Sequence, residues 1–274
     1  MQFVSLRVHC AENLQEILIS QLFAIGFDSF QEFEDGFSAS CDSMLFSQAE
    51  VEEVLSTFEH VSFFIQEEDK VNWNEEWEKH YDPIIVENKC IVRAPFHTMK
   101  ADFDYEIVVT PKMSFGTGHH ATTYLMLAFQ MKLDHVGKKI LDVGSGTGIL
   151  SIMASKRGAS TITAIDTDSW CIENGEENAR LNEIKNINFI EGEISVAPNH
   201  PYEVILANIN KNVLLAQLGQ YAERLVNHGT LIISGFYEND IQDLKSAGLM
   251  HQLLPTSIEV RDDWAMLVFS KQSI

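Results

Sequence analysis

Basic residues are scarce in this chain. Among its 274 residues, 19 are lysine or arginine and 40 are aspartate or glutamate, so the formal net charge is −21 at pH 7. A surface of this sign repels phosphate backbones, and proteins that bind nucleic acids usually carry the opposite balance. Direct nucleic-acid binding is therefore not expected, whereas a basic protein would be attracted. The same charge would also simply keep the protein in solution, so charge alone does not name a partner.

Long apolar runs and paired cysteines are also lacking. No run approaches the ~18–20 apolar residues that a membrane-spanning helix needs. The first residues, MQFVSLRVHC, lack a basic segment followed by an apolar core and a cleavage site, so no export signal is expected. The four cysteines are widely separated and form no CxxC pair, which argues against a zinc site and a disulfide framework. We therefore expect a cytoplasmic protein without a bound metal.

The first part of the chain predicts a small α+β domain, placed at residues 1–67. Its pattern favours a strand over residues 3–9, a helix over 12–26 and two strands within 27–41 that are joined at Asp35-Gly36. A second helix over 47–58 and a last strand over 61–66 follow. This order is the split ferredoxin-like pattern. A connecting helix is predicted over residues 68–82, because Trp73, Trp77 and Tyr81 recur every four residues along one helical face.

Residues 83–274 predict a larger α/β domain. Two short strands, within 84–95 and 105–111, precede an apolar helix near residue 121. From residue 137 onward, apolar strands alternate with helices, which is typical of a mostly parallel, Rossmann-like sheet with helices on both faces. The last two segments, 249–260 and 262–271, are predicted to be strands without a helix between them. An antiparallel hairpin is therefore expected at the edge of the sheet.

The strongest chemical signal is the segment ILDVGSGTGILSI. An apolar strand ends at Asp142 and is followed by Gly144, Gly146 and Gly148, after which an amphipathic helix begins. In an open parallel sheet, the ligand crevice lies beyond the carboxyl ends of the strands. Glycines at such a turn allow close approach of the backbone to a ligand, and the helix N-terminus offers N–H groups to an anionic group. The alternative is that the glycines only make a tight turn.

A second acidic residue indicates the class of ligand. Asp166 closes the strand TITAID, 22 residues after Gly144, which agrees with the spacing of about 20 residues to a carboxylate that binds ribose hydroxyls. The loop does not match the dinucleotide pattern GxGxxG, whose third glycine would fall at Ile149, and no Gly-Lys-Ser/Thr follows as in a Walker loop. We therefore expect a nucleoside-containing ligand. Asp168 is better explained as the N-cap of the next helix.

The stretch FGTGHHATT, Phe115–Thr123, poses a separate question. Its adjacent histidines would point in divergent directions, and no third ligand stands at a useful spacing, so a metal site is not expected. A phosphate cradle is disfavoured because the glycine loop lies farther along the chain. We interpret the stretch as a wall of the ligand pocket, with Thr123 facing the ligand. The residues expected to face the substrate are Phe115, Gly116, Thr117, Gly118 and His120.

Several of these motifs together resemble those of a known family. LDVGSGTG together with AIDTD resembles the class I S-adenosylmethionine-dependent methyltransferases. With FGTGHHATT and LANI added, the chain is similar to the bacterial PrmA family, which methylates the eleventh protein of the large ribosomal subunit. The resemblance continues through NWNEEWEKHYDPIIV and DDWAMLVFSK. The chain differs from the usual family pattern at Asn210-Lys211, where Leu-Ala is common.

The resemblance implies a cofactor, a substrate and a set of site residues. The cofactor would be S-adenosylmethionine, bound by Thr123, Asp142, Gly144, Gly146, Asp166 and Asn208. The substrate would be a basic ribosomal protein, free or on the ribosome, methylated on lysine side chains and at its N-terminal amine. The small N-terminal domain would recognise this substrate. Asn208 is the candidate catalytic residue, orienting the amine or the methionine end of the cofactor through its carboxamide; the alternative is that it caps the next helix.

Three other functions stay open. A methyltransferase of the same fold could act on another protein, a nucleic acid or a small molecule, although adenine methylation typically goes with Asn/Asp-Pro-Pro-aromatic and Asn208 is followed by Ile-Asn-Lys. A binding protein with a decayed pocket is a second alternative, which the intact Asp142, Gly144, Gly146 and Asp166 disfavour. A nicotinamide-dependent oxidoreductase is the third, and the spacing of the loop glycines disfavours it.

Overall fold

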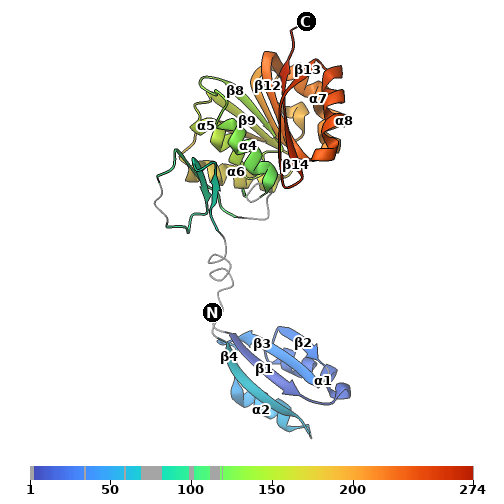
Figure 1. Cartoon of the computed structure of the whole chain (residues 1–274). Coiled ribbons are helices and arrows are strands. Elements are labelled where there is room, and N and C mark those ends of the chain that lie inside the picture. The colour runs from blue at the N-terminus through green and yellow to red at the C-terminus, as the bar shows by residue number, and fades with distance from the viewer. Residues whose placement is uncertain are drawn as a thin grey trace. The chain divides into compact units, whose positions relative to one another are not determined.

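The computed structural model of the chain describes residues 3–33, 35–58, 60–68, 82–98, 102–111, 118 and 120–273. The chain divides into two compact units, Met1–Tyr81 and Asp82–Ile274, which are described separately (Figure 1). The connecting helix predicted around Trp73–Tyr81 lies outside the described residues.

The first unit is a four-stranded antiparallel sheet in the order β2-β3-β1-β4, with helices α1 and α2. Its elements are β1 (Phe3–His9), α1 (Glu12–Ala24), β2 (Ser29–Phe33), β3 (Gly36–Asp42), α2 (Gln48–Ser56) and β4 (Ser62–Glu68). The core joins the sheet to both helices through Leu6, Leu18, Leu22, Val51 and Leu55, all essentially inaccessible. All six predicted elements are therefore present, and the first unit has a hydrophobic core of its own.

The hairpin between β2 and β3 depends on a glycine. Phe33 pairs with Gly36 across the turn, as the Asp35-Gly36 dipeptide predicts. Gly36 has a φ of +151°, and a Cβ atom there would lie 2.0 Å from the carbonyl oxygen of Val8 on β1. Only glycine therefore allows β1 and β3 to pair at this point.

The second unit contains a seven-stranded sheet in the order β10-β9-β8-β11-β12-β14-β13. Strands β10 to β12 in this order are parallel, and β14 runs antiparallel to both β12 and β13, so the terminal hairpin is confirmed. From α4 onward the elements are α4 (Ala121–Gln130), β8 (Lys139–Val143), α5 (Ile149–Lys156), β9 (Thr161–Asp166), α6 (Ser169–Leu181), β10 (Ile187–Glu191), η1 (Ile194–Val196), β11 (Tyr202–Asn208), α7 (Lys211–Arg224), β12 (Leu225–Tyr237), η2 (Glu238–Asp240), α8 (Ile241–Met250), β13 (Leu253–Arg261) and β14 (Trp264–Lys271).

Helices cover both faces of this sheet, and each face has its own core. One core packs α4 and α5 on the sheet, and the other packs α7 and α8 on the opposite face (Figure 1). The sequence did not predict α8, and the strand predicted over 249–260 was wrong at its start, since Leu249 and Met250 belong to that helix. In the part of the chain that the structure describes, no helix is long and apolar enough to span a membrane.

A three-stranded sheet, β5-β6-β7, precedes α4 in the chain. Its strands are β5 (Ile84–Val86), β6 (Cys90–Arg93) and β7 (Tyr105–Val108), so the single strand predicted within 84–95 was wrong. Glu87 and Asn88 both have positive φ, 52° and 53°, and turn the chain into an antiparallel hairpin. No glycine marks this turn, which explains why the pattern was read as one strand.

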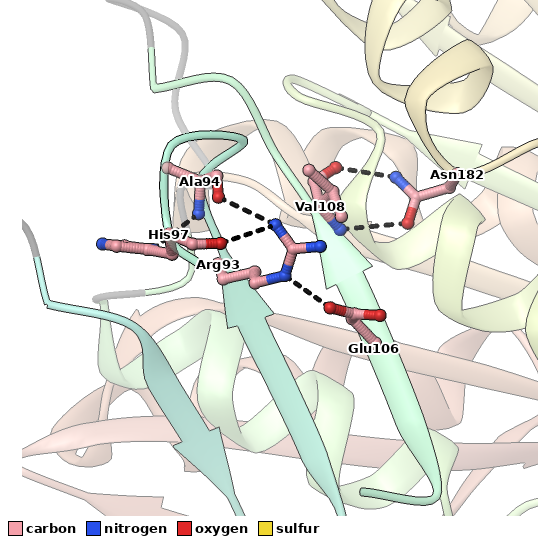
Figure 2. A network of polar contacts seen from close by, with 6 residues as sticks. All are labelled: Arg93, Ala94, His97, Glu106, Val108 and Asn182. Atoms are coloured by element: carbon pink, nitrogen blue, oxygen red, sulfur yellow. Dashed lines mark hydrogen bonds and ion pairs between the residues drawn. The ribbon is translucent and has the colours of Figure 1, made fainter. Parts of the chain in front are cut away.

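Polar contacts join β6 to β7 and β7 to helix α6 (Figure 2). The Arg93 guanidinium pairs with Glu106 across the two strands, and it also donates to the carbonyl oxygens of Ala94 and His97, at 3.1 and 3.3 Å. On the far side of β7, the backbone of Val108 is hydrogen-bonded to the Asn182 side chain, which follows α6. The small sheet is therefore attached to the large domain by polar contacts as well as by apolar packing.

Candidate functional site

A cavity of about 600 Å³ opens at the carboxyl ends of the parallel strands. It lies where Val143, Asp166, Gly192 and Asn208 end or follow β8, β9, β10 and β11. This is the position at which open α/β sheets bind their ligands, and the volume suits a small organic molecule. The cavity is lined by His120, Val143, Gly144, Gly146, Ile165, Asp166, Thr167, Asp168, Cys171, Gly192, Glu193, Ile194, Asn208, Ile209, Asn210, Val213, Gln217, Gly235 and Trp264.

The amides of the glycine loop point back into the protein. The N–H groups of Gly144 and Ser145 both donate to the Ile165 carbonyl oxygen, at 2.8 and 3.0 Å. The Gly146 N–H donates to Asp166 Oδ2 at 2.8 Å, and the Gly148 N–H donates to Ser145 O at 2.8 Å. These four amides are therefore already satisfied within the protein. The geometry disfavours a ligand that presents a pyrophosphate to this loop.

Asp166 lines the cavity where the sequence placed its ribose-binding carboxylate. Its Oδ2 accepts from Gly146, and its Oδ1 accepts from the Asp168 N–H at 3.1 Å. Each carboxylate oxygen has a second lone pair that can accept from a hydroxyl of a ligand. Asp168 accepts from the Trp170 N–H at 2.9 Å, which confirms it as the N-cap of α6.

Asn208 ends β11, and its side chain is oriented by a threonine. Its Nδ2 lies 3.5 Å from Thr123 Oγ1, and its Oδ1 is buried without a hydrogen-bond partner among the described residues. Asn208 lines the cavity, whereas Thr123 is fully buried on α4 and does not. The expectation that Thr123 faces the ligand is therefore replaced by a contact through Asn208.

The start of α7 shows that Asn208 is not a helix cap. The N-cap of α7 is Asn210, whose side chain accepts from the Val213 N–H at 3.1 Å. Lys211 donates to Asp240 at 2.7 Å, and the other Asp240 oxygen accepts from the Tyr237 N–H at 3.2 Å. The Asn210-Lys211 pair thus attaches the start of α7 to η2, at the end of β12.

The stretch Phe115–Thr123 contributes His120 to the cavity. His120 is the N-cap of α4, and its side chain accepts from the Thr122 N–H at 3.3 Å. Gly118 is buried, and a Cβ atom there would lie 2.8 Å from Ile84 Cδ1 of the small sheet. Phe115, Gly116 and Thr117 lie outside the described residues. Among the described residues, no cluster of His, Cys, Asp or Glu could hold a metal ion.

Two aromatic residues of the terminal strands were missed by the sequence analysis. The Trp264 ring lies 4.5 Å from the His120 ring and 4.2 Å from the Tyr237 ring, measured between centroids. His120 and Trp264 line the cavity, and Tyr237 is half exposed beside them. We call these three residues the aromatic cluster. No short motif marks it, because Tyr237 and Trp264 lie more than a hundred residues after His120.

Asp142 is fully buried behind the glycine loop. Its Oδ2 accepts from the Ser151 hydroxyl at 2.7 Å, and its Oδ1 has no partner among the described residues. Burial raises the pKa of Asp142 from 3.8 to about 7; the Ser151 hydrogen bond opposes this rise, and the nearby charge of Asp166 adds to it. Asp142 does not itself line the cavity.

The charge of the cavity indicates what it can hold. Among the described residues that line it, Asp166, Asp168 and Glu193 are acidic, and none is lysine or arginine. Such a lining favours a ligand with positive charge over a phosphorylated one. Apolar side chains such as Ile165, Ile194 and Val213 complete the walls. The residues fit a nucleoside whose other end is cationic.

The chain was compared with known proteins and structures. The family model described as "Ribosomal protein L11 methyltransferase (PrmA)" matches residues 4–272. A Porphyromonas gingivalis protein named "Ribosomal protein L11 methyltransferase" is 41% identical over 268 residues, which cover 96% of this chain and 92% of that protein. A Phocaeicola vulgatus protein of the same name is 36% identical over 266 residues and covers 95% of each chain.

Solved structures agree on the fold. The crystal structure of a ribosomal protein L11 methylase from Lactobacillus delbrueckii subsp. bulgaricus has a TM-score of 0.66 at 25% identity, covering 70% of this chain and 100% of that one. A methyltransferase from Pyrococcus furiosus has a TM-score of 0.53 at 16% identity, covering 61% and 90%, and it bears on the fold alone. The second unit thus has the fold of class I methyltransferases.

The raised pKa of Asp142 makes stability depend on pH. In the unfolded chain this carboxyl ionises near 3.8, whereas in the folded protein it stays protonated to about 7. The unfolded state therefore binds fewer protons in this window, and the free energy of unfolding falls as pH rises toward 7. Urea denaturation from pH 5 to 8 measures this contribution as wild type minus Asp142→Asn, which decreases up to about pH 7 and is flat above it. Parallel pH profiles of the two proteins would contradict the assignment.

Asp166→Ala tests the ribose-binding carboxylate. We expect the dissociation constant for S-adenosylmethionine to rise about 100-fold, because two hydrogen bonds to a charged group are lost. Isothermal titration calorimetry measures this change, and circular dichroism checks the fold. Asp134→Ala is the matched control, since Asp134 also accepts from a backbone N–H, that of Val136 at 3.1 Å, away from the cavity. Unchanged affinity in Asp166→Ala would remove Asp166 from the site.

Proposed function

The chain belongs to the PrmA family of ribosomal protein L11 methyltransferases, and from this premise we propose that it methylates lysine side chains and the N-terminal amine of ribosomal protein L11 with S-adenosylmethionine as methyl donor. The observation that carries the proposal is the cavity lined by both Asp166 and Asn208, whose buried Oδ1 has no hydrogen-bond partner among the described residues. One acceptor suits ribose hydroxyls, and the other suits an amine. We place the reaction in the cytoplasm.

The residues that would hold the cofactor follow from the lining of the cavity. When bound, S-adenosylmethionine supplies a methyl group on a positively charged sulfur. Asp166 would accept from the ribose hydroxyls, and Gly144 and Gly146 allow close approach of the loop backbone because they carry no side chain. The acidic lining and the absence of lysine and arginine among its described residues favour a cationic cofactor. Asp142 would support the loop from behind without touching the cavity.

Asn208 would orient the attacking amine. A lysine amine attacks only in its neutral form, because the protonated form, with a reference pKa of about 10.4, has no lone pair. The Asn208 Oδ1 can accept an N–H of this neutral amine and so direct its lone pair into the cavity. The same oxygen favours the positive charge that develops on the nitrogen as the new bond forms. Thr123 keeps the carboxamide in the required orientation.

The aromatic cluster would receive the lysine side chain. The faces of Trp264 and Tyr237 attract a cationic head group as it enters, while their apolar surface accommodates the aliphatic stem. Loss of water around the amine then disfavours its charged form and lowers its pKa. No acidic or basic side chain is required for this step, and the leaving thioether needs no proton.

The first unit supports a role in substrate recognition. Its element order and its sheet order, β2-β3-β1-β4, are those of a ferredoxin-like domain. We assign residues 1–67 to recognition of L11, residues 68–82 to the link between the two units and residues 83–274 to catalysis. L11 is taken to be a substrate free or on the ribosome, bound by protein contacts without direct binding of nucleic acid, as the net charge of −21 favours.

The direct test is transfer of labelled methyl groups. The purified protein is incubated with S-adenosylmethionine labelled on its methyl group and with total ribosomal proteins, and the products are separated by mass. We expect label on L11, at lysine and N-terminal amines. Label on other proteins but not on L11 would refute the substrate. A chain lacking residues 1–67 is the companion variant, and it should bind the cofactor normally yet leave L11 unlabelled.

Replacing Asn208 separates chemistry from cofactor binding. In Asn208→Ala we expect kcat to fall about 100-fold, because the amine loses its orienting acceptor. Thr123→Val keeps the volume and removes the hydroxyl near Asn208 Nδ2, so a fall of about tenfold is expected there. Steady-state kinetics at saturating cofactor and L11 measure both values. A wild-type kcat in Asn208→Ala would show that the carboxamide does not act on the amine.

A further inference from the structure

Two asparagines at the C-terminal end of α6 bind strand β7 and the residues just after it, which precede the stretch Phe115–Thr123 in the chain. Asn182 binds both backbone groups of Val108: its Nδ2 donates to the carbonyl oxygen at 2.7 Å, and its Oδ1 accepts from the N–H at 3.0 Å (Figure 2). The carboxamide thus pairs with β7 as a neighbouring strand would. The end of β7 is thereby fixed on α6.

Asn178, one turn earlier on α6, binds two segments at once. Its Oδ1 accepts from the Thr110 N–H at 2.9 Å, just after β7. Its Nδ2 donates to the carbonyl oxygen of Thr147 at 2.9 Å, in the middle of the glycine loop. A further contact of Nδ2, at 3.3 Å, is with Asn174 Oδ1. A single side chain therefore connects the glycine loop to the small sheet.

This connection reaches both walls of the cavity. The glycine loop forms one wall through Gly144 and Gly146. The small sheet lies under Gly118, since a Cβ atom at Gly118 would come within 2.8 Å of β5 and 3.3 Å of β6. His120, two residues later, lines the cavity. The placement of the small sheet relative to the glycine loop therefore affects how far apart these walls stand.

Burial makes the two bonds of Asn178 matter. The side chain is fully inaccessible to solvent. A buried carboxamide costs free energy unless its donor and its acceptor are both hydrogen-bonded. If the loop and the strand moved apart, either the Asn178 Oδ1 would lose the Thr110 N–H or the Thr147 carbonyl oxygen would lose the Asn178 Nδ2. The two bonds therefore select one relative placement.

We propose that Asn178 is a positioning residue for the cofactor site: it fixes the glycine loop and the small sheet relative to one another, and so sets the affinity for the cofactor. The proposal rests on the proposed function for the identity of the cofactor. It assigns no contact between Asn178 and the cofactor, because Asn178 does not line the cavity.

Asn178→Asp is the informative variant. A carboxylate can still accept from the Thr110 N–H, but it has no donor for the Thr147 carbonyl oxygen. We expect the dissociation constant for S-adenosylmethionine to rise about tenfold by calorimetry, as for the loss of one buried hydrogen bond. The KM for the cofactor should rise likewise, while kcat at saturating cofactor stays within about twofold of wild type.

Asn186→Asp is the matched control. Asn186 is half-buried, donates to the Ala159 carbonyl oxygen at 2.8 Å and accepts from the Ser155 hydroxyl at 2.7 Å, away from the cavity. It therefore loses the same kind of bond as Asn178→Asp, and it should be destabilised without a change in cofactor affinity. If both variants bind the cofactor as wild type does, or if both lose affinity in proportion to their thermal stability, the proposal is overturned.

Hydrogen exchange of the wild-type protein tests the same coupling should Asn178→Asp not fold. Binding of S-adenosylmethionine should slow exchange of the Thr110 amide, which donates to Asn178 and does not line the cavity. Unchanged protection of this amide on cofactor binding would overturn the proposal. If the wild-type protein does not bind the cofactor at all, it is the proposed function that fails. Normal binding without coupling to Asn178 or Thr110 removes only this inference.

Discussion

The hydrogen bond from the Gly146 amide to the Asp166 carboxylate is the interaction on which the site depends. It joins the loop after β8 to the end of β9 at 2.8 Å, and both residues line the cavity. Because Gly144 and Ser145 donate to Ile165 as well, the whole loop is folded back onto β9. At these positions the carbon atoms of the backbone, and not its N–H groups, therefore face the cavity. This geometry is what separates the site from a phosphate-binding loop of similar sequence.

The packing of Ile209 explains why glycine is needed both in the loop after β8 and on β12. Ile209, which follows β11, lies between the glycine loop and β12. A Cβ atom at Gly144 would approach Ile209 Cγ2 to 2.3 Å, and one at Gly235 would approach the Ile209 carbonyl oxygen to 2.2 Å. Gly235 is also the bulged residue of β12, with a φ of +96°. The two glycines leave room for Ile209, and this places Asn208 beside the loop.

Local patterns predicted the parts of the site that are continuous in sequence. The strand that ends at Asp142, the glycines after it and the carboxylate at Asp166 follow from spacing and from the topology of a parallel sheet. The capping role of Asp168 was predicted for the same reason, since it depends on residues two positions away. Family resemblance, and not spacing, singled out Asn208. The carboxyl ends of parallel strands meet at one edge, so one correct assignment of strands brings these residues together.

The parts that were missed depend on contacts between distant segments. Trp264 reaches His120 only because the chain reverses after β13 and inserts β14 between β12 and β13. The turn at Glu87-Asn88 uses left-handed backbone at two successive residues, of which only Asn88 is of a type that favours it, and no glycine marks the turn. Nothing in the sequence distinguishes Asn178 from the other polar residues of α6. Its role is seen only once β7 and the glycine loop are both in place.

Charge links the site to the surface of the protein. The net charge of −21 gives no structural information by itself. The cavity is also acidic, because its described lining contains three acidic residues and no lysine or arginine. A cationic cofactor and a basic protein substrate are thus favoured by the same field, and the approach of each depends on ionic strength. The amine must nevertheless be neutral when it reacts. The mechanism proposed above therefore combines an acidic surface for encounter with the apolar rings of Trp264 and Tyr237, beside which the amine would give up its proton.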